Sequence, residues 1–126
     1  MTTILLVDDD PLQASLMLSV LGRRFCDVRR AKDAAQALCL IEQPEFAGGL
    51  GLVISGHHTP EVGGPAFVGE LRSRMPNLPV LVIGTARETQ ADYAYPRVVF
   101  LPKPYTSETM LTLTGEMLAG RKSAVA

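Results

Sequence analysis

Short apolar runs alternate along the chain with segments whose apolar residues recur at helical spacing. Five of these runs are five or six residues long and are bounded by turn residues or proline, so they predict buried strands. The runs cover residues 3–7, 27–31, 50–55, 79–84 and 97–101. The second run is poor in apolar residues, which is typical of an edge strand.

Helical patterns follow the strands. Asp10 is placed to cap the first helix, with Pro11 at its first position and an apolar face formed by Leu12, Leu16 and Val20. Further helices are predicted over residues 33–43, 65–75 and 106–119, with a loop at residues 48–49 and a weak pattern of two helical turns over residues 87–94.

Five strands that each precede a helical crossover predict a parallel sheet covered by helices on both faces. The predicted fold is a doubly wound α/β sandwich, with residues 1–120 as a single domain and residues 121–126 as a C-terminal tail. In such sheets, ligands bind at the carboxyl ends of the strands. Candidate functional residues are therefore expected directly after the strands.

Composition narrows the class of protein. The chain has 126 residues, 47% of them hydrophobic and 20% charged, which is ordinary for a globular domain. A net charge of −1 gives no reason to expect nucleic acid or an anionic membrane as a partner, and the arginine pairs at 23–24 and 29–30 are interpreted as solvated surface. Cys26 and Cys39 form no C-x-x-C pattern and predict reduced, partly buried thiols. With no signal peptide and no apolar stretch that spans a bilayer, the expected compartment is the cytoplasm.

Asp8, Asp9 and Asp10 directly follow the first apolar run. Carboxylates gathered at a strand end repel one another unless a cation or a lysine neutralises them, so the cluster indicates a site. Asp10 is explained by its role as the cap, which leaves Asp8 and Asp9. Two interpretations of this pair stay open: a structural cluster neutralised by Lys103 and loop amides, or a residual metal site.

Polar residues also follow three other predicted strands. Gly56, His57 and His58 follow the third, Thr85 follows the fourth, and Lys103 follows the fifth. An acidic pair, a hydroxyl and a lysine are the groups that bind a divalent cation and steady a phosphoryl group. The neighbouring histidines point to opposite sides of an extended segment, which favours exposed imidazoles over two ligands of one ion.

These segments together resemble the receiver domain of two-component response regulators. The resemblance extends from residue 4 to about residue 118 and depends on residues 5–10, 53–64, 79–86 and 100–105, in the same order and loop positions as in the family. It implies the flavodoxin-like (βα)5 fold, with five parallel strands in the order 2-1-3-4-5. The site positions that it implies are the acidic pair Asp8 and Asp9, the switch hydroxyl Thr85, the lysine Lys103 and the aromatic switch Phe100.

The chain departs from the family at the phosphate acceptor. In receivers the third strand is followed by an aspartate that takes the phosphoryl group from a histidine kinase, whereas this chain has Gly56 there. Glycine has no nucleophile and no metal-ligating side-chain oxygen. The remaining metal ligands that the resemblance implies are Asp8, Asp9 and the backbone carbonyl of His58. We therefore expect magnesium binding to be weak or absent, and no other cofactor.

A second departure lies between Thr85 and Lys103. This connection is several residues shorter than receivers usually have, and it contains Pro96. The fourth helix of the receiver pattern is therefore expected to be short, irregular or absent. In the family, this helix forms the partner-binding face together with the fifth strand and the fifth helix, and a homodimer through that face is one expectation.

Three functions are weighed. The favoured hypothesis is a stand-alone pseudo-receiver, not an enzyme, that contacts a histidine kinase, a response regulator or another effector without phosphorylation; the chain ends soon after the last helix, so no output domain is expected. The second is a receiver regulated by a displaced phosphosite, or by a small ligand or metal in the vacated acidic pocket. The third, a flavodoxin-type cofactor binder, is disfavoured because carboxylates after the first strand would repel a cofactor phosphate.

Overall fold

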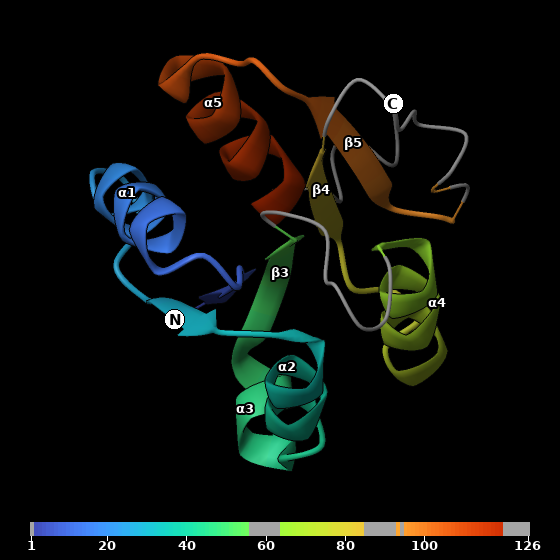
Figure 1. The fold of residues 1–126 in the computed structure, drawn as a ribbon. Helices are drawn as coiled ribbons and strands as arrows, with labels where there is room; N and C mark the ends of the chain where they lie inside the picture. The colour runs from blue at the N-terminus through green and yellow to red at the C-terminus, as the bar shows by residue number, and fades with distance from the viewer. Residues whose placement is uncertain (1, 56–63, 85–92, 94, 120–126) are drawn as a thin grey trace.

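The structure is a computed structural model that describes residues 2–55, 64–84, 93 and 95–119. Five strands and five helices are assigned in this part of the chain (Figure 1). In chain order they are β1 (Thr3–Val7), α1 (Pro11–Leu21), β2 (Val28–Ala31), α2 (Ala34–Ile41), α3 (Pro44–Gly49), β3 (Leu50–Ser55), α4 (Gly64–Arg74), β4 (Val80–Gly84), β5 (Val98–Pro102) and α5 (Ser107–Leu118). No helix in the described ranges is long and apolar enough to cross a membrane.

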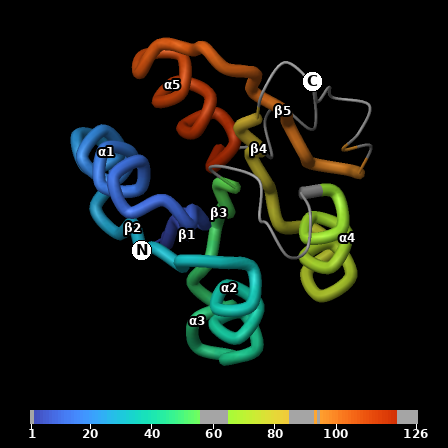
Figure 2. The backbone as a smooth tube through the Cα atoms, in the orientation of Figure 1, coloured from blue at the N-terminus to red at the C-terminus, as the bar shows by residue number. Residues whose placement is uncertain are grey.

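The strands form one parallel sheet in the order β2-β1-β3-β4-β5, which confirms the predicted doubly wound α/β fold and its topology. Helices α1 and α5 cover one face of the sheet, and α2, α3 and α4 cover the other (Figures 1 and 2). Because all strands run in the same direction, their carboxyl ends share one edge. The predicted site residues follow strands that end there.

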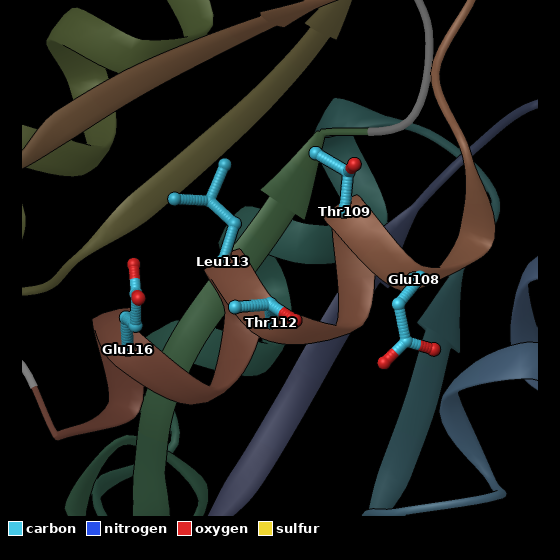
Figure 3. A pocket seen from close by; sticks show the side chains of 5 residues that line it. All are labelled: Glu108, Thr109, Thr112, Leu113 and Glu116. Atoms are coloured by element: carbon cyan, nitrogen blue, oxygen red, sulfur yellow. The ribbon is translucent and has the colours of Figure 1, made fainter.

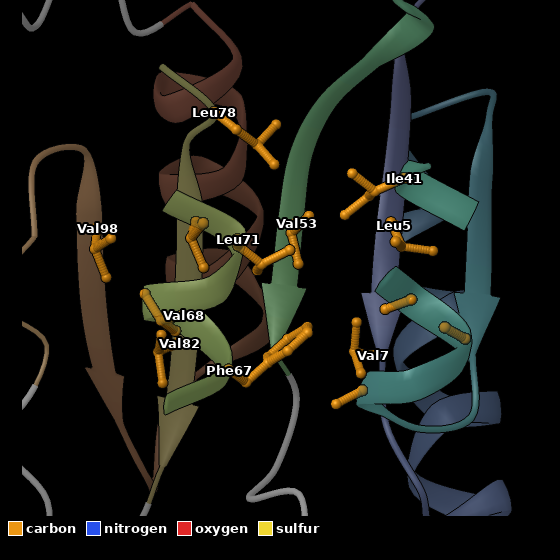
Figure 4. Packing of buried hydrophobic residues seen from close by; sticks show 14 of the residues in the cluster. Leu5, Val7, Ile41, Val53, Phe67, Val68, Leu71, Leu78, Val82 and Val98 are labelled. Atoms are coloured by element: carbon orange, nitrogen blue, oxygen red, sulfur yellow. The ribbon is translucent and has the colours of Figure 1, made fainter. Parts of the chain in front are cut away.

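Successive strand residues enter different halves of the core. In β4, Val80 and Val82 pack with the helices on the α4 side, whereas Leu81 and Ile83 pack with α1 and α5. This alternation is the period of two of a pleated strand, and here both faces are covered. Figure 4 shows the first of the two clusters, in which Phe67 and other side chains of α4 and α2 lie against the strands.

Helix α1 begins as predicted but buries a different face. The carboxylate of Asp10 accepts hydrogen bonds from the backbone amides at the start of the helix, which is the predicted cap. The helix packs on the sheet through Ala14, Met17 and Leu21. The apolar face predicted from spacing is wrong as a core face, because Leu12 is 70% and Leu16 is 60% exposed.

Two other expectations are corrected. Residues 48–49 were expected in a loop, but they end the short helix α3, which Pro44 opens with its fixed backbone angle. Cys26 and Cys39 are free, as expected, but they are exposed rather than partly buried. Cys39 lies between Ala37 and Ile41, the residues through which α2 is buried, and it points away from them.

The second strand begins one residue later than predicted, and Asp27 before it makes a structural link. Its carboxylate accepts hydrogen bonds from the Thr3 hydroxyl at 2.7 Å and from Arg29 Nε at 3.2 Å. These two bonds hold the pKa of Asp27 below its usual value. The edge strand is thereby tied to β1 near the amino ends of the sheet.

The connection that precedes β5 is anchored by an aromatic ring. Tyr93 is 1% exposed and stacks on Phe100 of β5, with 5.7 Å between the ring centroids and 13° between the ring planes. Tyr95 lies on α4, and its hydroxyl is so close to Gly69 that a Cβ there would come within 2.8 Å of it. The predicted helical turns over residues 87–94 lie outside the described residues, apart from Tyr93.

Candidate functional site

Asp8 is the buried carboxylate at the carboxyl edge of the sheet. Its side chain is at the end of β1 and only 1% exposed, and its backbone amide continues the pairing with β2 by donating to the Ala31 carbonyl at 3.1 Å. The Oδ1 atom accepts a hydrogen bond from the Asp10 amide at 2.9 Å. Asp9, the next residue, is exposed. The acidic pair therefore consists of one buried carboxylate and one carboxylate that faces solvent.

Arg30 of β2 reaches the same edge. Its Nε and Nη2 atoms donate to the Asp8 carbonyl oxygen at 3.1 and 2.8 Å. The interpretation of residues 29–30 as solvated surface is therefore wrong for Arg30, which is partly buried and adds a fixed positive charge beside the acidic pair. The interpretation as surface holds for Arg29, which is exposed. Arg29 pairs with Asp27, and its guanidinium is 5.9 Å from the ring centre of Phe46.

Lys103 and Tyr105 come from the segment after β5. The Lys103 amide donates to the Gly84 carbonyl at 2.8 Å, which fixes this segment against the end of β4 at the same edge. The half-buried Tyr105 hydroxyl donates to the sulfur of Met17 at 3.3 Å. Burial raises the pKa of Tyr105, and the charge of Asp8 raises it further, so the phenol lies within electrostatic reach of the acidic pair.

Three predicted site residues, Gly56, His58 and Thr85, lie outside the described residues. Gly56 directly follows Ser55, the buried last residue of β3, and Thr85 directly follows Gly84, the last residue of β4. Both strands end at the edge that carries Asp8 and Lys103.

Phe100 occupies the predicted switch position in β5. It pairs with Val82 of β4 in register, and its partly buried ring stacks on Tyr93. The ring also packs against the core cluster on the α4 side, and a stacked, packed ring loses contact energy in another rotamer. The structure thus places Phe100 in one packed orientation next to the connection that precedes β5.

The donors at this edge fit a magnesium ion only in part. Magnesium takes six oxygens in octahedral geometry, and the described residues offer two carboxylates, one of which already accepts a backbone hydrogen bond. Within the described ranges, no group of three or more His, Cys, Asp or Glu side chains could hold a metal ion. The described side chains thus supply carboxylate oxygens from Asp8 and Asp9 alone, beside the charge of Arg30.

The outer surface of α5 carries a shallow hollow, separate from the residues at the carboxyl edge of the sheet. The hollow has a volume of about 320 Å³. Figure 3 shows the five side chains that line it. The lining side chains are Glu108, Thr109, Thr112, Leu113 and Glu116. Four of the five are exposed and polar, unlike the apolar walls of an enclosed ligand site.

Sequence reasoning missed Arg30 and Tyr105 as neighbours of the acidic pair. Once β2 is paired in parallel with β1, Arg30 falls opposite Leu6, two residues before Asp8, and a long side chain covers that distance. The signal was therefore present in the predicted strand order. Tyr105 follows Lys103 by two residues, but only the path of the chain after β5 brings it toward α1.

Comparison with known proteins identifies the family. The model of the response regulator receiver domain family matches residues 4–114. The chain belongs to this family, whose members are signalling modules of two-component systems. The match assigns the chain to receivers rather than to flavodoxin-type cofactor binders, although both have the same topology.

The chain is also similar to individual curated proteins. It is 30% identical over 122 residues to the sensor kinase CckA of Brucella abortus, with 92% of this chain and 12% of that protein covered. It is 29% identical over 129 residues to the transcriptional regulator NtrC of a Bradyrhizobium strain, with coverages of 98% and 25%. The chain therefore spans only a small part of the length of these relatives.

Solved structures share the fold. A receiver domain protein of Clostridium thermocellum superimposes with a TM-score of 0.83 at 17% identity, over 100% of both chains. A receiver protein of Sinorhizobium medicae gives a TM-score of 0.81 at 24% identity, over 95% of this chain and 96% of that chain. At these identities the likeness establishes the fold alone.

Proposed function

We propose that this receiver domain acts through protein–protein contacts that do not depend on phosphorylation. One observation carries the proposal: β3 ends at Ser55, and the next residue, where the family has its acceptor aspartate, is Gly56. Phosphoryl transfer to a receiver needs a carboxylate nucleophile at this edge of the sheet, and glycine has none. On this proposal the domain is not an enzyme, and it keeps one signalling conformation.

The balance of charge supports the same proposal. Without a third carboxylate, Asp8 and Asp9 are matched in number by the cations of Arg30, which lies in β2, and Lys103, which follows β5. A balanced cluster does not need a dication to relieve repulsion between its carboxylates. We therefore propose that magnesium binds weakly and that the fold of the domain is independent of it.

Removing the positive charge of Arg30 is expected to strengthen divalent-ion binding. Arg30→Ala removes the guanidinium that bonds to the Asp8 carbonyl. The dissociation constant for Mn²⁺, used as a spectroscopic substitute for Mg²⁺, should then fall about fivefold, equivalent to about 1 kcal/mol. Arg29→Ala is the matched control, because it removes the same charge from the neighbouring residue, which faces Asp27. Equal Mn²⁺ affinity in both variants would show that Arg30 does not compensate the acidic pair.

Insensitivity to the activating ligands of receivers tests the proposed single conformation. We expect the ¹H–¹⁵N correlation spectrum of the full chain to keep the positions of the Phe100 and Tyr93 amides when Mg²⁺ and beryllofluoride are added together. The stacked pair should hold these positions because no acyl phosphate mimic forms beside them. Stoichiometric shifts at both amides would refute the proposal and would favour regulation by a ligand in the vacated pocket.

The partner is proposed to be a signalling protein: a histidine kinase, a response regulator or another effector. The names of the curated relatives, a sensor kinase and a transcriptional regulator, are in line with this class. The net charge of −1 disfavours a polyanionic partner such as nucleic acid. A homodimer through the β5 and α5 side would use the polar outer surface of α5 shown in Figure 3.

A further inference from the structure

The guanidinium of Arg72, near the end of α4, has one bonded edge and one unpaired edge. Its Nη1 atom donates to the carbonyl oxygens of Met75 and Pro76, at 2.9 Å each, which fixes the group at the end of the helix. Its Nε and Nη2 atoms form the other edge; they are buried and have no hydrogen-bond partner among the described residues. Burial of two unpaired donors costs free energy that a bound acceptor would recover.

A second cation, Arg97, directly precedes β5 at the amino edge of the sheet, opposite the acidic pair. Its carbonyl oxygen accepts a hydrogen bond at 3.0 Å from the amide of Val80, where β4 begins. Helix α4 runs antiparallel to the strands, from Phe67 toward Leu78 near their amino ends (Figure 4), so its last turn lies at the same edge. Burial lowers the pKa of Arg72, and the charge of Arg97 lowers it further, which places the two guanidinium groups within electrostatic reach of each other.

The backbone of Arg97 adopts a conformation that arginine rarely takes. Its φ of 61° lies in the left-handed region, which glycine adopts without steric cost. The side chain is exposed, so it gains no burial that would offset this cost. An exposed arginine held in a backbone conformation suited to glycine indicates that its charge has a use.

Neither of the two arginines has a carboxylate partner in the described part of the chain, whereas Arg24, Arg29 and Arg74 all form ion pairs there. Two neighbouring guanidinium groups repel each other, and an anion between them would relieve the repulsion. Their combined charge of two matches a phosphate dianion better than a single carboxylate. The planar fork formed by Nε and Nη2 also fits two oxygens of one phosphate.

We propose that Arg72 and Arg97 form a binding site for a phosphate dianion at the amino edge of the sheet. The Nε and Nη2 atoms of Arg72 donate to two phosphate oxygens, and Arg97 supplies the second charge from the surface. The site does not involve the residue at position 56, so it can fail or hold independently of the proposed function.

Entry of phosphate requires a side chain to move, because the unpaired edge of Arg72 is enclosed. Tyr95 is an exposed side chain on this face of α4: its hydroxyl lies next to Gly69, one helical turn before Arg72. We expect the Tyr95 ring to turn outward when phosphate binds. Tyr95→Ala should therefore bind phosphate more tightly, and weaker binding in this variant would contradict the expected route of entry.

Titration of the ¹⁵N-labelled full chain with inorganic phosphate, at constant ionic strength against chloride, tests the proposal. We expect a saturable shift of the Arg72 Nε–H signal and of the Val80 amide, with a dissociation constant of about 1 mM, as suits a small exposed site. Absence of saturable shifts up to about 50 mM phosphate would overturn the proposal.

Three variants identify the groups that bind. Arg97→Gly removes one charge and suits the left-handed backbone, so the fold should be at least as stable while phosphate binding weakens about fivefold. Arg72→Lys keeps the charge but loses the fork, and it should weaken binding by a similar factor. Arg23→Ala removes an exposed arginine after α1 and is the matched control. Equal phosphate affinity in all three variants would show that the shifts come from non-specific screening.

Two further titrations define the anion. Acetate should bind more weakly than phosphate because it carries one charge, and equal affinities would overturn the assignment to a dianion. Glycerol 3-phosphate carries the same dianion on an ester. Saturable binding of this ester would assign the site to phosphomonoesters, whereas binding of inorganic phosphate without the ester would assign it to free phosphate.

Discussion

Purified protein incubated with acetyl phosphate and Mg²⁺ is expected to acquire no phosphoryl group, as measured by intact-protein mass spectrometry. The reason is chemical rather than conformational: Gly56 follows β3 where a receiver requires a carboxylate. Asp10 cannot replace it, because its Oδ1 atom accepts hydrogen bonds from the amides of Leu12 and Gln13. Gly56→Asp should gain a phosphoryl group that hydroxylamine removes, because the other polar groups of the family site are retained.

Gly48→Asp provides the control for this experiment. It introduces a carboxylate at an exposed glycine where a Cβ meets no atom within 4 Å, far along the chain from the acidic pair. This variant should stay unmodified. A hydroxylamine-sensitive phosphate on the unchanged protein would contradict the proposed function, and peptide mapping to Asp9 would identify a displaced phosphosite.

Loss of the Tyr93 ring is expected to destabilise the domain more than any surface change discussed above. Tyr93 is 1% exposed, belongs to the core cluster of Val82 and Val98, and stacks on Phe100. Tyr93→Ala leaves a cavity and removes the ring contact, which together should cost about 3 kcal/mol of unfolding free energy and lower the melting temperature by about 10 °C. Urea and thermal denaturation followed by circular dichroism measure both quantities.

Two control variants show whether the loss of unfolding free energy comes from the buried ring of Tyr93. Tyr93→Phe keeps the ring and should retain most of the stability, whereas Tyr95→Ala truncates a ring that is 38% exposed and should cost less than about 1 kcal/mol. Equal effects of Tyr93→Ala and Tyr95→Ala would mean that the connection before β5 is not anchored by the buried ring. The proposed single orientation of Phe100 would then lose its structural basis.

Local patterns along the chain were enough to place the strands and the first helix cap. Strands β1 and β3 coincide with their predicted ranges, because each run is apolar throughout and bounded by polar or turn residues. Asp10 was identified as a cap because it directly precedes Pro11 at the start of a helical pattern. The short helix α3 was missed, because two glycines in sequence are more often found in a loop than at a helix end.

The orientation of α1 could not be predicted from local patterns of apolar residues. This helix has apolar residues on both sides, Met17 and Leu21 on one and Leu12 and Leu16 on the other, so periodicity alone cannot choose the buried side. Packing against the sheet and α5 makes the choice. The exposure of Leu12 and Leu16 is therefore a result of tertiary structure.

The sequence by itself determined the alternation of strands and helices, the parallel sheet that follows from it, and the glycine at position 56 on which the proposed function depends, because these depend on residue type and spacing along the chain. Only the tertiary structure decided that Arg30 bonds to the Asp8 carbonyl, that Tyr105 bonds to the sulfur of Met17, and that Leu12 and Leu16 face solvent. These features depend on how the strands pair and on which side each helix packs, and both are set by elements that are distant in sequence.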